Sequence, residues 1–175
     1  MPDAAEHVIL VDEHDNPIGT LEKHAAHKDG GRLHRAFSVF LTDDAGRVLL
    51  QRRASTKYHF GGLWTNTACG HPRPGERTVA AAQRRLFEEM GVRAELAEVG
   101  TFTYAAQDDG SGLTEREIDH VCLGAFTGSP TPDPEEAEGW RWIDPDELDR
   151  ELRASPEQFT PWFPLAWNVA RPNLP

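Results

Sequence analysis

Residues 70–92, GHPRPGERTVAAAQRRLFEEMGV, contain the clearest helical pattern in the chain. The apolar side chains recur three or four positions apart, the period of one helix face, at Val79, Ala82, Leu86 and Met90. Gly91 stands where the C-terminal cap of a helix belongs. We therefore predict a helix over residues 76–90 that packs one face against a core and leaves a charged face available for other contacts.

Short strand patterns lie on both sides of this helix. The apolar or alternating runs are residues 7–11, 36–41, 48–51, 98–104, 118–126 and 139–143. Residues 43–46 and 110–112 are typical of hairpin turns, and Asp144 and Thr160 precede prolines as helix N-caps do. Strands joined mostly by hairpin turns, with a few helices, favour a mixed α/β (α+β) fold in which a β-sheet is sandwiched between helices, over a doubly wound parallel sheet.

The length of 175 residues suits one compact domain, residues 1–175, which can bury a core without disulfides. The two cysteines are therefore expected to be reduced thiols. Residues 1–6 lack the basic start and the apolar segment of a secretory signal, so we expect a cytoplasmic protein. No apolar run approaches the roughly 18 residues of a membrane span. Nothing in the sequence demands an obligate protein partner.

The formal net charge of −11 disfavours nucleic acid as a partner, because phosphate backbones bind basic surfaces. The same charge should repel a small anionic substrate. A phosphate ester would therefore need clustered Lys and Arg side chains, or bound divalent cations, to overcome this field locally.

Residues 70–92 also resemble the Nudix box, a loop and helix that present carboxylates to a metal-bound diphosphate. The matching positions are Gly70, Glu76, Arg84, Leu86, Glu88, Glu89, Gly91 and Val92. A single Arg–Glu pair would be interpreted as an i,i+4 pair on a solvated helix face, and only the full spacing favours the motif. The box normally has Glu after its Arg, whereas this chain has Arg85. A guanidinium there removes a metal ligand and adds donors for diphosphate oxygens, which makes hydrolysis less expected.

Residues 64–72, WTNTACGHP, place the Cys69 thiol two positions before the His71 imidazole. Taken alone, a buried structural cysteine is the simpler interpretation. The segment nevertheless closely resembles the WTN-x-x-C-x-HP signature of type I isopentenyl-diphosphate isomerases, a branch of the Nudix superfamily. Similar family segments follow in the expected order at residues 6–10, 19–23, 26–27, 33–34 and 115–117. The resemblance implies a Nudix fold and an enzyme that interconverts isopentenyl and dimethylallyl diphosphate for isoprenoid biosynthesis.

Three histidines and two glutamates form a candidate metal site. His27, His34 and His71 come from three segments, and Glu115 and Glu117 are spaced for one face of an extended chain. Any one of these histidines would more often be structural. The resemblance implies that the five residues hold one divalent metal, and this ligand set suits Mn, Fe, Co or Zn better than Mg. No role is predicted for His7, His14, His24, His59 or His120.

The resemblance also assigns residues to the diphosphate end of the substrate. It implies that Glu89 helps to hold a magnesium ion against the diphosphate, as a hard oxygen ligand does. It further implies that Lys23, Arg53, Lys57 and Arg85 bind the diphosphate. Arg53 and Lys57, taken singly, could be ordinary surface cations.

At the hydrocarbon end, the resemblance implies that Cys69 and Glu117 are an acid–base pair. We predict that Glu117, assisted by Tyr104, delivers a proton to the terminal methylene while Cys69 removes one on the other side, with roles exchanged in reverse. Whether the proton passes directly from Glu117 or through Tyr104 stays open. A nearby cation or helix N-terminus could make Cys69 a usable thiolate. Trp162 would face the cationic intermediate or be a core tryptophan, and Trp64 could serve either end.

Two other functions compete with this prediction. A Nudix pyrophosphohydrolase shares the fold and the substrate group, but Arg85 and the Cys69–His71 pair argue against it. A catalytically inactive binding protein could use the same scaffold, and the presence of both Cys69 and Glu117 argues against that. A purely structural domain leaves the thiol, the histidines and the carboxylates unexplained.

Overall fold

Strand β3 is the centre of a mixed β-sheet in the computed structural model of the protein, which describes residues 6–175. The strands are β1 (His7–Val11), β2 (Pro17–Glu22), β3 (His34–Thr42), β4 (Val48–Arg53), β5 (Trp64–Thr65), β6 (Ala68–Gly70), β7 (Leu96–Gln107), β8 (Thr114–Ala125) and β9 (Ala137–Ile143). β8 runs parallel to β3, with His34 beside Glu117, and β6 runs antiparallel to it, with Cys69 beside Ser38. The predicted thiol and one predicted metal-ligating carboxylate therefore lie on two neighbours of one central strand.

The outer strands extend this sheet in both directions. β1 contacts β3 and pairs along its length with β2, while β7 pairs antiparallel with β8 through the predicted turn near residue 110. The hairpin predicted between residues 36–41 and 48–51 forms at its turn, but the two strands do not pair along their length. Within the described residues β3 and β4 pair only at Thr42 and Val48, because β6 lies beside β3 there and β9 pairs with β4.

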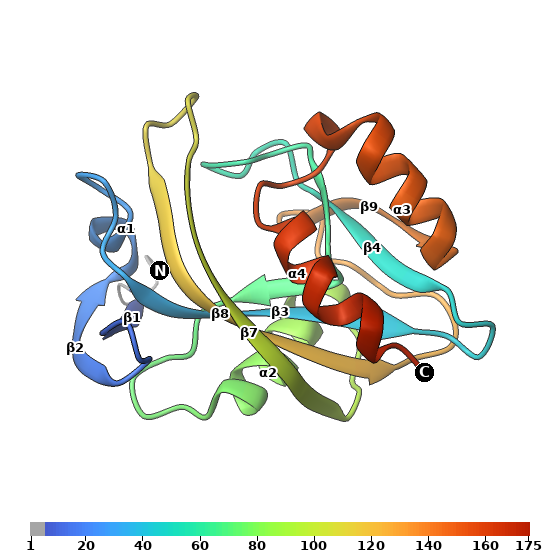
Figure 1. The fold of residues 1–175 in the computed structure, drawn as a ribbon, viewed down its shortest axis with the longest axis horizontal. Helices are drawn as coiled ribbons and strands as arrows, with labels where there is room; N and C mark the ends of the chain where they lie inside the picture. Colours follow the sequence, from blue (N-terminus) through green and yellow to red (C-terminus); the bar gives the residue numbers. More distant parts are fainter. Residues whose placement is uncertain (1–5) are drawn as a thin grey trace.

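Helices cover both faces of the sheet. Within residues 6–175 they are α1 (Lys23–Ala26), α2 (Thr78–Met90), α3 (Pro145–Ala154) and α4 (Phe163–Ala170), with short 3-10 turns η1 (Pro156–Gln158) and η2 (Arg171–Asn173). Side chains alternate along β3, so Val39 and Leu41 pack against Leu86 of α2, whereas Phe40 packs against Phe163 of α4. Figure 1 shows α2 on one side of the central strands and α3 and α4 on the other. This arrangement confirms the predicted class, a mixed sheet sandwiched between helices.

Of the helix ends predicted at Gly91, Asp144 and Thr160, the first two are right, and the helix predicted from residue 76 begins at Thr78. Gly91 ends α2 in the left-handed conformation, with φ of +66°, and a Cβ atom there would lie 2.6 Å from the carbonyl oxygen of Thr131. Asp144 caps α3 by accepting hydrogen bonds from two backbone N–H groups. The cap predicted at Thr160 is wrong, because its hydroxyl is hydrogen-bonded to that of Thr65 and α4 begins at Phe163 without a side-chain cap.

Residues 1–5 lie outside the described residues. The predicted domain boundary at residue 1 and the expectation about a secretory signal in residues 1–6 therefore stay predictions. Between residues 6 and 175, no helix is both long enough and apolar enough to cross a bilayer.

Candidate active site

A polar pocket lies between α1, α2, β6, β8 and the loop that joins β4 to β5. The predicted site residues on its lining are Lys23, Arg53, Lys57, Cys69, His71, Arg85, Glu89, Tyr104, Glu115, Glu117 and Trp162. His27 and His34 are not on this lining and are fully buried next to it. The fold thus gathers all the predicted site residues from segments that are far apart in the sequence.

The five predicted metal ligands form one buried cluster. Suitable donor atoms of His27, His34, His71, Glu115 and Glu117 all lie within 4.8 Å of one another. Nε2 of His27 is 2.9 Å from Glu115, and Nε2 of His71 is 2.8 Å from Glu117. The Nε2 atoms of His34 and His71 also face each other at 3.2 Å. Three ring nitrogens and two carboxylates converging in a buried space are consistent with a metal site.

The protonation states of His71 and Glu117 suit a divalent cation. Burial lowers the pKa of His71 well below its usual value, assisted by His34 and Lys23, so the imidazole is neutral and has a lone pair to donate. Burial opposes ionisation of Glu117, but hydrogen bonds with Glu115 and His34 and the nearby imidazoles hold its pKa down at about 2. Metal ligands must be deprotonated in this way, so these two residues fit the ion that the sequence predicts. Burial opposes protonation of His27, but its hydrogen bond to Glu115 and the nearby carboxylates raise its pKa, so an ion bound there must displace a proton.

Glu117 is also hydrogen-bonded on its other oxygen. Tyr104, its register neighbour on β7, donates its hydroxyl to Oε2 of Glu117 at 2.9 Å. Burial and the adjacent carboxylates raise the pKa of Tyr104 well above its usual value, so the phenol keeps its proton. Asp119, two positions further along β8, lines the same pocket and accepts a hydrogen bond from Ser38.

Cys69 faces the predicted cation, but its thiol stays protonated. The guanidinium of Arg53 points at Sγ from 3.9 Å. Burial and the charge of Glu89 nevertheless outweigh this cation and raise the pKa of the Cys69 thiol to about 12. The expectation that a neighbouring cation makes Cys69 a thiolate is therefore not met by Arg53 alone.

Aromatic side chains close the inner end of the pocket. Trp162 is buried, donates its indole N–H to Asn66 at 3.1 Å, and lies against Phe60 with ring centroids 5.6 Å apart. Arg53 lies 5.4 Å from the centre of the same indole ring. Trp64 has no part in this lining, because its ring lies under the guanidinium of Arg141 at 4.6 Å.

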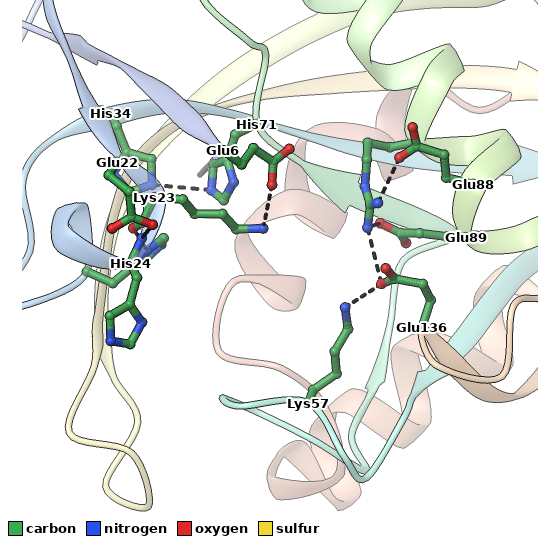
Figure 2. Close-up of polar contacts among 12 residues, drawn as sticks. Glu6, Glu22, Lys23, His24, His34, Lys57, His71, Glu88, Glu89 and Glu136 are labelled. Atoms are coloured by element: carbon green, nitrogen blue, oxygen red, sulfur yellow. Dashed lines mark hydrogen bonds and ion pairs between the residues drawn. The ribbon is translucent and has the colours of Figure 1, made fainter. Parts of the chain in front are cut away.

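Cations line the outer part of the pocket, and carboxylates hold most of them. Figure 2 shows Lys23 with Glu6 on one side and Lys57 with Glu136 on the other. Arg85 donates to Glu88 and Glu89 of its own helix, both at 2.8 Å, and to Glu136 at 3.1 Å. Gly70 makes room for Arg85, since a Cβ atom there would lie 3.1 Å from its Cγ. The predicted diphosphate-binding side chains are thus all present, and Lys23, Lys57 and Arg85 are already paired with carboxylates.

Comparison with known proteins places these features in one family. The NUDIX domain model matches residues 32–163. A crystal structure from Deinococcus radiodurans shares the fold, with a TM-score of 0.75 at 22% identity over 95% of this chain and 98% of that one. An isopentenyl-diphosphate Delta-isomerase from Serratia proteamaculans is 55% identical over 90% of this chain and 87% of the relative. One from Halorhodospira halophila is 51% identical, covering 90% of this chain and 91% of its own.

The chain belongs to the isopentenyl-diphosphate Delta-isomerase family.

This membership confirms the family and the Nudix fold predicted from the sequence. The structure of this isopentenyl-diphosphate Delta-isomerase family member also places residues at or beside the pocket that were not predicted from the sequence: Glu6, His59, Asp119 and Glu136. Asp119 continues the alternation of Glu115 and Glu117, so the period of two could have indicated it. Glu136 lies in a proline-rich loop and His59 in a loop without any periodic pattern, and no local signal marks either of them. His120 is held between Asp15 and Glu98 outside the pocket lining.

Proposed function

We propose that this chain, an isopentenyl-diphosphate Delta-isomerase family member, moves the double bond of isopentenyl diphosphate within the pocket described above to give dimethylallyl diphosphate. The observation that carries the assignment of the site is that Cys69 and the hydrogen-bonded Tyr104–Glu117 pair line one pocket, with the cations of its outer part beside them. A hydrolase needs a further carboxylate on α2 where this chain has Arg85, which supports isomerisation over hydrolysis.

The reaction requires one proton to be added and another to be removed. In the isomerisation direction Glu117, hydrogen-bonded to Tyr104, delivers a proton to the terminal methylene carbon, and the double bond opens to a tertiary carbocation. Cys69, as thiolate, removes a proton from the adjacent methylene carbon, and its electron pair forms the new double bond. The gained and lost protons balance. The reverse reaction begins with Cys69 as thiol and Glu117 ionised, the protonation states that the surroundings favour without substrate. The forward reaction begins only after Cys69 has given up its proton and Glu117 has gained one.

The cationic intermediate needs a dry site that tolerates positive charge. Trp162 is 4% exposed, and its indole N–H is engaged by Asn66, which fixes the ring at the inner end of the pocket. A desolvated indole face stabilises a cation by about 2 kcal/mol or more. Phe60 and Tyr104 pack beside it and help to exclude water, which would otherwise capture the cation.

We assign one divalent transition metal, Mn, Fe, Co or Zn, to His27, His34, His71, Glu115 and Glu117. When bound, such an ion supplies fixed positive charge that organises the carboxylates around the reacting end of the substrate. Glu89, buried beside Arg85, is assigned to a magnesium ion that accompanies the diphosphate. Lys23, Arg53, Lys57 and Arg85 bind the diphosphate oxygens and offset the negative charge of the protein.

The proposed setting is the cytoplasm, with a small diphosphate as partner and neither nucleic acid nor a membrane nor an obligate protein partner involved. The net charge of −11 supports the exclusion of nucleic acid.

The assignment of Glu117 is tested by Glu117→Gln, which keeps the shape of the side chain but removes the proton donor. Turnover of isopentenyl diphosphate should fall by about 100-fold to 10,000-fold while the folded state persists. Glu157→Gln, at an exposed position on η1, is the matched control and should turn over at the wild-type rate. Wild-type turnover by Glu117→Gln would contradict the assigned role.

A further inference from the structure

His59 is a buried histidine outside the five-residue metal cluster. It lies in the loop of residues 54–63, between β4 and β5, yet only 8% of its surface is exposed. Its Nε2 donates a hydrogen bond to Oε1 of Glu115, while Oε2 of the same carboxylate lies 2.9 Å from Nε2 of His27. One oxygen of Glu115 is therefore directed to the metal cluster, and the other is hydrogen-bonded to His59.

The loop around His59 contains Lys57 and binds Arg53, two of the cations assigned to the substrate. Arg53 donates to the backbone carbonyl oxygens of His59 and Phe60, both at 3.2 Å, and Lys57 lies two residues before His59. Phe60 has φ of +51°, a strained conformation for a side chain of this size, so contacts elsewhere must hold the loop in place. The His59–Glu115 hydrogen bond links this loop directly to β8.

We propose that His59 is a positioning residue that fixes the carboxylate of Glu115 within the metal cluster and anchors to it the loop that carries Lys57. The inference rests on the metal site proposed above. Hydrogen bonds to the outer oxygens of ligating carboxylates orient these ligands, and losing such a partner typically costs 10-fold to 100-fold in metal affinity. The same bond makes the position of Lys57 depend on an ordered Glu115. The metal cluster and the diphosphate-binding loop therefore become ordered together.

Two variants separate the hydrogen bond from the bulk of the ring. His59→Phe removes the donor and keeps an aromatic ring against Tyr58 and Phe60, whose centroids lie 4.3 Å and 5.4 Å from that of His59. His59→Gln replaces the imidazole but returns an amide N–H near the position of Nε2. The full-length wild-type and variant proteins are loaded with Co²⁺, whose visible absorption reports its ligands, and the metal is then withdrawn by a competing chelator.

We expect the dissociation constant for Co²⁺ to rise about 10-fold to 100-fold in His59→Phe and to stay within about threefold of wild type in His59→Gln. The absorption bands at saturating Co²⁺ should be the same in all three proteins. Unchanged affinity in His59→Phe, or equal weakening in both variants, would overturn the positioning role. Altered bands at saturation would overturn it in favour of direct ligation. A wild-type protein that holds no Co²⁺ would instead contradict the metal site itself, and the role of His59 with it.

Trypsin tests the anchoring of the loop without any enzyme assay. Cleavage after Lys57 requires the loop to open, because the backbone N–H of Lys57 is hydrogen-bonded to Ala54 and its side chain is paired with Glu136, and both contacts must break before this segment fits a protease. With saturating Co²⁺, cleavage there should be at least severalfold faster in His59→Phe than in wild type, relative to the other cleavage sites. Equal rates would overturn the anchoring of the loop.

Discussion

The guanidinium of Arg85 donates a hydrogen bond to Glu136 at 3.1 Å, and the same carboxylate is bonded to Lys57. A diphosphate that binds both cations must displace Glu136, because this carboxylate bridges Arg85 and Lys57. Figure 2 shows Lys57 directed at Glu136, with a dashed line between them.

This relationship predicts that Glu136→Gln binds inorganic pyrophosphate about twofold to fivefold more tightly than wild type in magnesium-free buffer. The reason is that a partly exposed ion pair worth up to about 1 kcal/mol no longer competes. Isothermal calorimetry measures the change. Glu138→Gln is the matched control, since Glu138 bonds to Ser55 and Arg52 and does not line the pocket. Weaker binding by Glu136→Gln would mean that Glu136 assists the diphosphate.

Cys69→Ala should lose turnover by about 100-fold to 10,000-fold, because the adjacent methylene then has no base or acid positioned against it. Metal content and melting temperature should match wild type, since the thiol belongs to neither the metal cluster nor the two main cores. Cys122→Ala tests the other cysteine of the chain, which is buried in the core against α2. Its turnover per folded molecule should stay unchanged, and comparable losses in both variants would contradict the role of Cys69.

Replacing Trp162 should slow turnover in a graded order, with Trp162→Phe intermediate and Trp162→Leu reduced tenfold or more. The order follows the strength of the π face that stabilises a cation. The corresponding control is Trp142→Leu, because Trp142 stacks on Phe126 and does not line the pocket. Steady-state kcat, measured on variants with wild-type secondary structure, provides the comparison. Equal rates for the Phe and Leu variants would indicate that Trp162 acts by packing alone.

Gly91→Ala should destabilise the protein by more than Gly46→Ala. Both glycines have positive φ, +66° and +75°, so each alanine incurs about 1–2 kcal/mol of backbone strain. At Gly91 the new Cβ also meets the carbonyl oxygen of Thr131 at 2.6 Å, whereas nothing lies within 4 Å at Gly46. Urea unfolding measures the difference. Equal losses of stability would show that the loop at Thr131 moves without cost.

The parts of the fold predicted from the sequence are those that local patterns control. Helix α2, its end at Gly91 and the period-two carboxylates of β8 depend on neighbours within a few residues, and these predictions hold. The pairing of β4 with β9 joins segments far apart in the chain. The predicted turn between β3 and β4 is present, but their pairing ends at Thr42 and Val48, because a turn pattern does not indicate which strands lie beyond the turn.

The same limit applies to the site. The family motif identified the residues that converge on the pocket, but contacts such as His59 to Glu115, 56 positions apart, leave no local pattern. The raised pKa of Cys69 could not be predicted from the sequence either, because burial and the charge of Glu89 outweigh the effect of Arg53. The charges that surround a group are a property of the folded chain.

The most direct test of the central claim is proton and phosphorus NMR of the purified protein with isopentenyl diphosphate and magnesium in heavy water. The account predicts dimethylallyl diphosphate that carries deuterium, with no inorganic phosphate or pyrophosphate released. Release of phosphate without new alkene signals, or an unchanged substrate, would contradict it.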